Sequence, residues 1–356
     1  MLAWLASHNR VALARLLDHD PVWLMEDGDP RTLPIDDLAA ALTRHVDGGA
    51  DRLPGGYHLD QAALRRFARP GLEERVVGLL ARARGTAKNH LLEIIRAGRY
   101  RSASPQLAAI IGGGYAPPGL RLTAVVALAA CGSPDDIAAA AADIVAWGRP
   151  LRPPEEIRFE AERDDEIIVR LIATGYPSAF GANTALRLLR RLTGKDYATA
   201  GVRLLPAIPA APDTDLPVLV AGLNALSFAT SSPRAAVTPL GSITLRALGA
   251  TLARIVAERA DLIDAEMLAT LRRVLRTIRG GGGRHGYALA KDAGLSAAIQ
   301  ENAAFRETAF AIVAAQPGER LNLQAIRTLL IEPGLPVKGG DKPGHGAAGA
   351  VLAGAE

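Results

Sequence analysis

Two clusters of charged side chains have the residue types and spacing to take part in recognition, and the first is basic. Five arginines lie within 13 residues, at Arg272, Arg273, Arg276, Arg279 and Arg284. Because Arg272, Arg276 and Arg279 are separated by four and three positions, they share one face of a helix. Such a stripe could contact the phosphates of a nucleic acid or pair with acids on a solvated surface. The net charge of only +4 favours the second interpretation.

The second cluster is acidic and covers residues 155–166. It contains seven carboxylates: Glu155, Glu156, Glu160, Glu162, Asp164, Asp165 and Glu166. Two close carboxylates can do acid–base work when a pocket desolvates one of them. Crowded charges of one sign more often form a solvated loop or helix start. We therefore interpret the run as solvated and expect partner contacts at Glu160, Glu162, Asp164 and Asp165 and at the five arginines.

Motifs for catalysis, cofactors and metals are incomplete. Residues 281–286 match the letters of a dinucleotide-binding glycine loop, but they follow a basic helical segment and not a strand, which indicates an inter-helix connector. Residues 18–20 and 26–29 lack the further ligands that zinc or calcium requires. The single cysteine, Cys131, lies in an apolar helical context and is expected to be buried and inert. We expect no enzyme activity, no cofactor, no metal and no small-molecule substrate.

A helical period runs through most of the chain, and no segment has the alternation typical of a strand. Expected helix starts near Thr86, Ser104, Gly119 and Ser133 are spaced by 18, 15 and 14 residues. Two helices with their turns thus occupy roughly 30 to 35 residues, the size of one α-solenoid repeat. The sequence predicts an all-α fold, an α-solenoid of HEAT-like helix pairs. The tryptophans, Trp4, Trp23 and Trp147, are expected to be core anchors between repeats.

Four regions follow from composition. Residues 1–204 and 218–333 are expected to form N-terminal and C-terminal helical-repeat arrays, joined by a Pro-rich loop or linker at 205–217. Residues 334–356 are rich in glycine, lack a core period and are expected to be a disordered tail. No apolar run approaches the ~20 residues that span a bilayer, and no secretory signal is present, so we expect a cytoplasmic protein without membrane contact.

Several segments taken in order carry a resemblance to a known family. They read LLDHDPVWLMEDGDP, FARPGLEERVVGLL, HLLEIIRAG, PPGLRLTAVVALAACGSPDDI and RDDEIIVRLIATGYP. Their layout resembles the HEAT-like helical region of bacterial NACHT-type (STAND) ATPases over roughly residues 1–335. In that family the helical array follows an ATPase module and senses a partner or shields the ATPase, often in defence or signalling. The sequence has no phosphate loop, so the resemblance implies no ATP hydrolysis here.

Two functions remain as alternatives. The first is a non-catalytic scaffold or sensor that binds a protein partner on an α-solenoid surface. The second is a nucleic-acid-binding helical repeat, comparable with the HEAT-like DNA glycosylases, in which arginine stripes hold the phosphates. A second basic cluster, with Arg96, Arg99 and Arg101 around Tyr100, offers such a binder a stacking ring. The sequence leaves open the partner, the oligomeric state, the groove-lining residues and the pathway.

Overall fold

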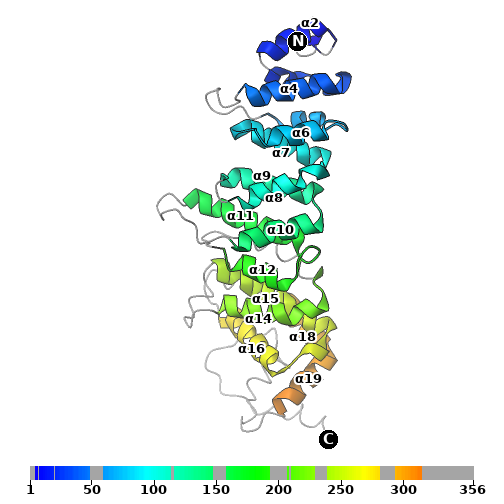
Figure 1. Ribbon diagram of the computed structural model, residues 1–356. Helices are drawn as coiled ribbons and strands as arrows, with labels where there is room; N and C mark the ends of the chain where they lie inside the picture. The colour runs from blue at the N-terminus through cyan, green and yellow to red at the C-terminus, as the bar shows by residue number, and fades with distance from the viewer. Residues whose placement is uncertain are drawn as a thin grey trace. The chain divides into compact units, whose positions relative to one another are not determined.

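The computed structural model describes residues 5–6, 8–19, 21–48, 59–113, 116–146, 158–192, 207, 210–228, 239–280 and 293–314. Every regular element within these ranges is a helix (Figure 1), so the predicted all-α class is confirmed. The chain divides into two compact units. The N-terminal unit comprises Met1–Phe180 and Arg187–Thr193, and the C-terminal unit comprises Gly181–Leu186 and Gly194–Glu356.

The N-terminal unit is a succession of short helices. They are α2 (Arg10–His19), α3 (Pro21–Asp27), α4 (Ile35–Asp47), α5 (Gln61–Phe67), α6 (Glu73–Leu80), α7 (Gly85–Gly98), α8 (Ser104–Gly112), α9 (Pro118–Cys131), α10 (Pro134–Ala146) and α11 (Arg158–Gly175), with 3-10 turns η1 (Pro30–Thr32) and η3 (Arg101–Ala103). Each helix packs on those next to it in the chain or one further along, such as α6 on α7, α7 on α9, and α9 on α11. This stacking within the unit is compatible with a solenoid.

The helix starts follow the sequence signals closely. Helices α7, α8, α9 and α10 begin within one residue of the expected starts. At the start of α10 the Ser133 hydroxyl accepts the Asp136 N–H at 3.2 Å, while the Asp136 carboxylate accepts the Ser133 N–H at 2.9 Å. This reciprocal pair satisfies backbone donors that have no intrahelical partner. The Ser133 hydroxyl, which donates to the Asp136 carboxylate at 2.7 Å, and the Ser133 N–H hold the pKa of the Asp136 carboxyl below its usual value.

Polar side chains tie neighbouring turns of the N-terminal unit together. The Arg69 guanidinium donates from Nη1 to the carbonyl oxygens of Pro30 and Leu33, each at 2.7 Å. The Tyr100 hydroxyl donates in turn to the carbonyl oxygen of Arg69 at 2.7 Å. Tyr100 is only 3% exposed, so its ring is a core residue and does not offer the stacking surface that the nucleic-acid alternative would use.

The C-terminal unit has its own helical core. Its elements are η5 (Asp213–Asp215), α14 (Leu216–Ser227), α15 (Pro239–Glu258), η7 (Ala260–Leu262), α16 (Ala265–Gly280), α18 (Ala293–Glu301) and α19 (Ala303–Ala314); α12 (Ala182–Leu189) contributes residues to both units. The long helix α15 packs on α14, α16 and α18. Leu216 and Pro217, the last residues of the predicted linker, open α14. The predicted tail at 334–356 lies outside the described residues.

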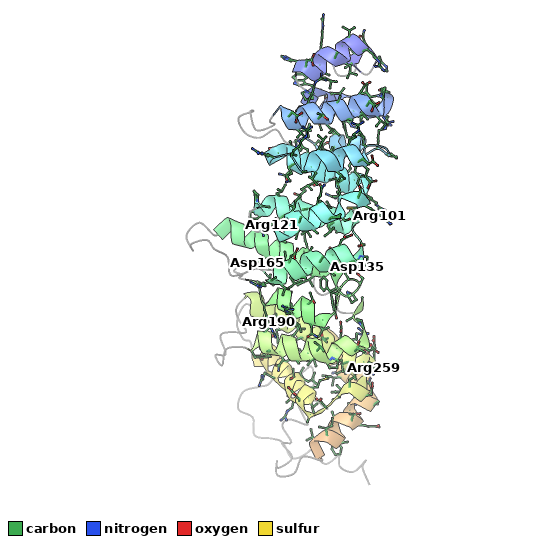
Figure 2. The ribbon with its side chains drawn as sticks, in the orientation of Figure 1. Arg101, Arg121, Asp135, Asp165, Arg190 and Arg259 are labelled. Carbon is green, nitrogen blue, oxygen red and sulfur yellow. The ribbon has the colours of Figure 1, made fainter. Side chains whose placement is uncertain are left out.

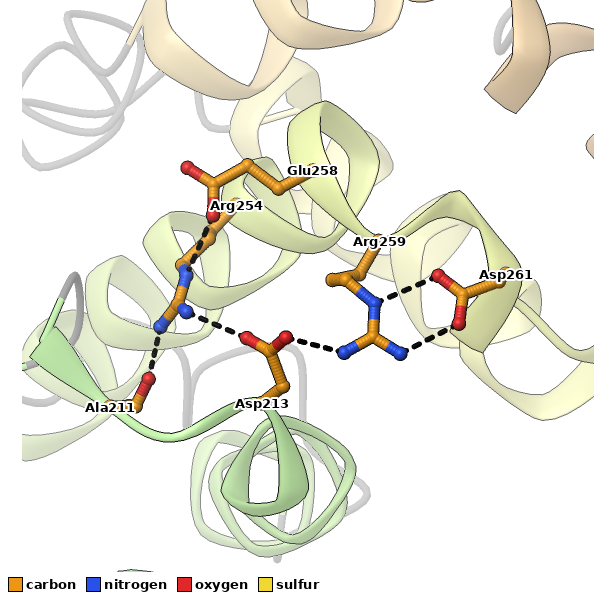
Figure 3. Close-up of polar contacts among 6 residues, drawn as sticks. All are labelled: Ala211, Asp213, Arg254, Glu258, Arg259 and Asp261. Carbon is orange, nitrogen blue, oxygen red and sulfur yellow. Dashed lines mark hydrogen bonds and ion pairs between the residues drawn. The ribbon is translucent and has the colours of Figure 1, made fainter.

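An ion-pair network fixes the turn before α14 to the end of α15 (Figure 3). Asp213 accepts from Arg254 at 2.8 Å and from Arg259 at 2.5 Å, and its carboxylate lies between the two guanidinium groups. Arg254 also donates to the carbonyl oxygen of Ala211 at 2.6 Å, and Arg259 makes a two-pronged pair with Asp261 at 2.9 and 2.7 Å. Bidentate pairs of this kind are directional, so the network sets the path of the chain here.

Among the described helices, none is both long enough and apolar enough to cross a lipid bilayer.

Candidate functional site: an exposed apolar surface at α2 and α3

The predicted arginine stripe is only partly within the described residues. Arg272 is half-buried and Arg273 is exposed on α16. The guanidinium carbon of Arg273 lies 5.2 Å from the centroid of the Phe228 ring, a cation–π contact within the C-terminal unit. Arg276 and Arg279 are on the same helix with undescribed side chains, and Arg284 lies outside the described residues. A phosphate-binding role for the stripe therefore stays a prediction.

Of the four acidic residues predicted to contact a partner, only Asp165 has a described side chain. Glu160, Glu162 and Asp164 are on α11, and their side chains are not described. Asp165 is 1% exposed, so the expectation of a solvated carboxylate is wrong at this position. Helix α11 packs on α9, which buries Arg121 to 4% exposure, and both residues are labelled in Figure 2. A buried carboxylate and a buried guanidinium on two packed helices are structural charges, unavailable to a partner on the surface.

The perturbed carboxylates of the described residues have structural tasks. Asp29 caps η1 and pairs with Arg31, Glu73 accepts from the N–H and hydroxyl of Ser102, and Asp261 pairs with Arg259. Each of these contacts lowers the pKa of the carboxyl group, because hydrogen bonds to the charged form favour it. Metal-binding groups of three or more His, Cys, Asp or Glu side chains do not occur within the ranges that the structure describes.

Cys131 is buried, as the sequence predicts. Burial raises the pKa of its thiol to about 11, so the nucleophilic thiolate is scarce at neutral pH.

Exposed apolar side chains are concentrated at the N-terminal helices. Within the described parts of the chain, the large hydrophobic residues that are exposed are Leu5 at 42%, Val11 at 64% and Trp23 at 54%. Leu5 lies in helical residues before α2, Val11 lies on α2 and Trp23 lies on α3, and α2 and α3 pack together. Contiguous exposed apolar surface can mark an interaction site. We call the three residues, with the groove described next, the N-terminal apolar surface.

A groove of about 450 Å³ runs along one side of α2. It is lined by Leu5, Asn9, Val11, Ala12, Arg15, Leu16 and His19. Ala12, Leu16 and His19 are spaced by four and three residues, so the groove follows a single stripe of the helix. The Asn9 side chain accepts the N–H groups of Val11 and Ala12, at 2.9 and 3.1 Å, and thereby fixes the helix start at one end of the groove.

The groove is bordered by basic side chains. Arg15 and His19 line it, and none of its lining residues in the described part of the chain is a carboxylate. Of the two acidic neighbours of His19 in the sequence, Asp18 is paired with Arg44 at 2.9 Å, and Asp20 lies outside the described residues. The groove therefore combines apolar side chains with the cationic guanidinium of Arg15 at its border.

Trp23 corrects one prediction made from the sequence. It was expected to anchor the core, but its neighbours Val22, Leu24 and Met25 are buried in its place. Trp4 and Trp147 lie outside the described residues. Four consecutive apolar residues in a seven-residue helix cannot all face the core, and the sequence does not indicate which is left outside. The sequence does not predict the N-terminal apolar surface, because α2 and α3 have the apolar spacing of ordinary repeat helices.

Comparisons with known proteins find no match among protein-family models, curated proteins or solved structures.

Proposed function

We propose that this chain is a non-catalytic helical-repeat scaffold or sensor module that binds a protein partner through its N-terminal apolar surface. One observation carries the proposal: Leu5, Val11 and Trp23, the exposed large hydrophobic residues of the described ranges, all lie within the first 23 positions. Leaving a tryptophan and a valine in water costs free energy that a partner recovers by covering them. Tryptophan is also enriched among the residues that dominate binding energy at protein interfaces.

The proposal also includes a cellular process and a cellular location. The resemblance to the helical region of bacterial STAND ATPases points to signalling or defence, where such arrays sense partners. A cytoplasmic location belongs to the same proposal, because a single cysteine provides no disulfide framework of the kind common in secreted proteins.

Affinity capture with matched variants tests this function. The double variant Val11→Ser with Trp23→Ser removes the two most exposed apolar side chains, whereas Val77→Ser makes a similar exchange on α6. Loss of a tryptophan contact alone costs about 2 kcal/mol, or roughly 30-fold in affinity. We expect specific proteins to be captured by the native chain and by Val77→Ser and to be lost from the double variant.

Two results would contradict the proposal. Capture that is unchanged in the double variant, with circular dichroism showing that both variants keep their helices, would place the binding site elsewhere. The nucleic-acid alternative is tested by fluorescence anisotropy with labelled DNA and RNA at low and moderate salt. Tight binding that weakens steeply with salt would replace the protein-partner proposal and direct mutagenesis to Arg272 and Arg273.

A further inference from the structure

We infer that the groove beside α2 binds an amphipathic helix that carries acidic side chains along its flank. The inference rests on the proposed function and names the chemistry of the partner segment.

The shape of the groove fits a helix. The helix α2 has ten residues, a length of roughly 15 Å or nearly three turns. The stripe of Ala12, Leu16 and His19 on its side repeats at the four-and-three spacing by which two helices pack along a common seam. Ala12 is small and lets a partner backbone approach closely. Leu5 and Val11 supply exposed apolar surface at the same groove for the partner's own apolar stripe.

The charge of the groove selects an acidic helix. The Arg15 guanidinium and the His19 ring are both exposed, and the described residues that line the groove include no carboxylate. Acidic side chains at the edge of a partner helix would meet these groups, and complementary charges both steer association and fix orientation. A basic helix would place like charges together at the same border.

Two competing occupants fit less well. A second copy that packed α2 against α2 would bring two Arg15 groups to one groove, which like-charge repulsion disfavours. A lipid surface requires a helix that offers its apolar face outward. In α2 most of that face is used by the core: Leu13 and Leu17 are buried there, and Leu16, at the groove, is only 8% exposed.

A matched pair of charge reversals tests the inference on the full chain. Arg15→Glu reverses a charge that lines the groove. Arg10→Glu makes the same change on the same helix, but five positions away and thus about 140° around the helix, outside the groove. The probe is a fluorescein-labelled peptide of about three heptads with Leu at positions a and d and Glu at e and g. Its counterpart has Lys at e and g.

We expect the Glu peptide to bind, more tightly at low salt, and the Lys peptide to bind at least about tenfold more weakly. Arg15→Glu should weaken binding of the Glu peptide about three- to tenfold, and Arg10→Glu should change it less than about twofold. Equal binding of the two peptides, equal effects of the two variants, or no binding of the Glu peptide at high micromolar concentration would each overturn the inference. So would binding to phosphatidylglycerol vesicles that Arg15→Glu abolishes.

The result separates this inference from the proposed function. If capture of a partner depends on Val11 and Trp23 while the Glu peptide does not bind, the partner-binding function stands and the acidic helix is wrong. If neither the capture nor the peptide depends on the N-terminal apolar surface, both fail.

Discussion

Replacing Tyr100 by phenylalanine should lower the free energy of unfolding at neutral pH and raise it, relative to the native chain, at high pH. The protonated hydroxyl stabilises the fold through a hydrogen bond, whereas its ionisation at high pH destabilises the fold. The ring is 3% exposed and the hydroxyl donates to the carbonyl oxygen of Arg69 at 2.7 Å. Burial, together with the nearby Glu73 carboxylate, raises the pKa of Tyr100 to about 12 from a reference value of 10.0. The variant Tyr100→Phe removes both the hydrogen bond and the ionisation while keeping the ring.

The sign of the pH effect follows from the raised pKa. The folded chain holds Tyr100 protonated, so its contribution to stability is complete below pH 10, where the unfolded tyrosine is protonated as well. That contribution is lost as pH rises from about 10 to about 12, and at pH 11 the loss is about 1.4 kcal/mol. The phenylalanine variant has no such loss, but at neutral pH it lacks a buried hydrogen bond that contributes about 1 kcal/mol.

The two stability curves should therefore cross at roughly pH 10.7. The assay is urea denaturation followed by circular dichroism at pH values from about 8 to about 11. Cys131 also has a raised pKa, but it is present in both chains and its effect cancels in the difference. If the difference in unfolding free energy between the native chain and Tyr100→Phe stays constant over the whole pH range, the burial of Tyr100 is refuted.

Three further predictions concern single residues. Cys131 should react with Ellman's reagent far more slowly in the native chain than in urea, because its thiol is buried and its pKa is about 11; native reaction at the unfolded rate would contradict this. Asn302→Ala should lower unfolding free energy by about 1 kcal/mol in urea titrations, because the side chain caps α19 at the N–H of Phe305, at 3.0 Å; an unchanged midpoint would argue against the cap. Gly98→Ala should destabilise by about 1 to 3 kcal/mol, because a Cβ there meets the Tyr100 ring; a neutral thermal shift would show that the ring yields.

Local signals in the sequence predict the helices of this protein well. The apolar spacing of Leu91, Leu92 and Ile95 corresponds to the buried face of α7, and Ser133 starts α10 as its type and position indicate. These features depend on backbone geometry and on residues within one or two turns. Even here residue type does not determine the cap: Ala103 occupies the N-cap position of α8, and Ser104, a common capping residue, is buried inside the helix start.

The functional surface could not be predicted in the same way. Trp23 and Asp165 each have the environment opposite to the one that their residue types suggest, one exposed and the other buried. Burial is decided by which neighbouring helix covers a given stripe, and that information is not local in the sequence. A tryptophan in a short helix next to a basic, partly apolar helix is the one signal that could have drawn attention to α2 and α3.

The most direct test of partner binding is photo-crosslinking in living cells, with benzoylphenylalanine in place of Val11 and, separately, in place of Val77. Both residues are on helices of the N-terminal unit, but only Val11 belongs to the N-terminal apolar surface. We predict a discrete protein adduct from position 11 and none from position 77. Adducts from position 77 alone, or none from either position, would contradict the account.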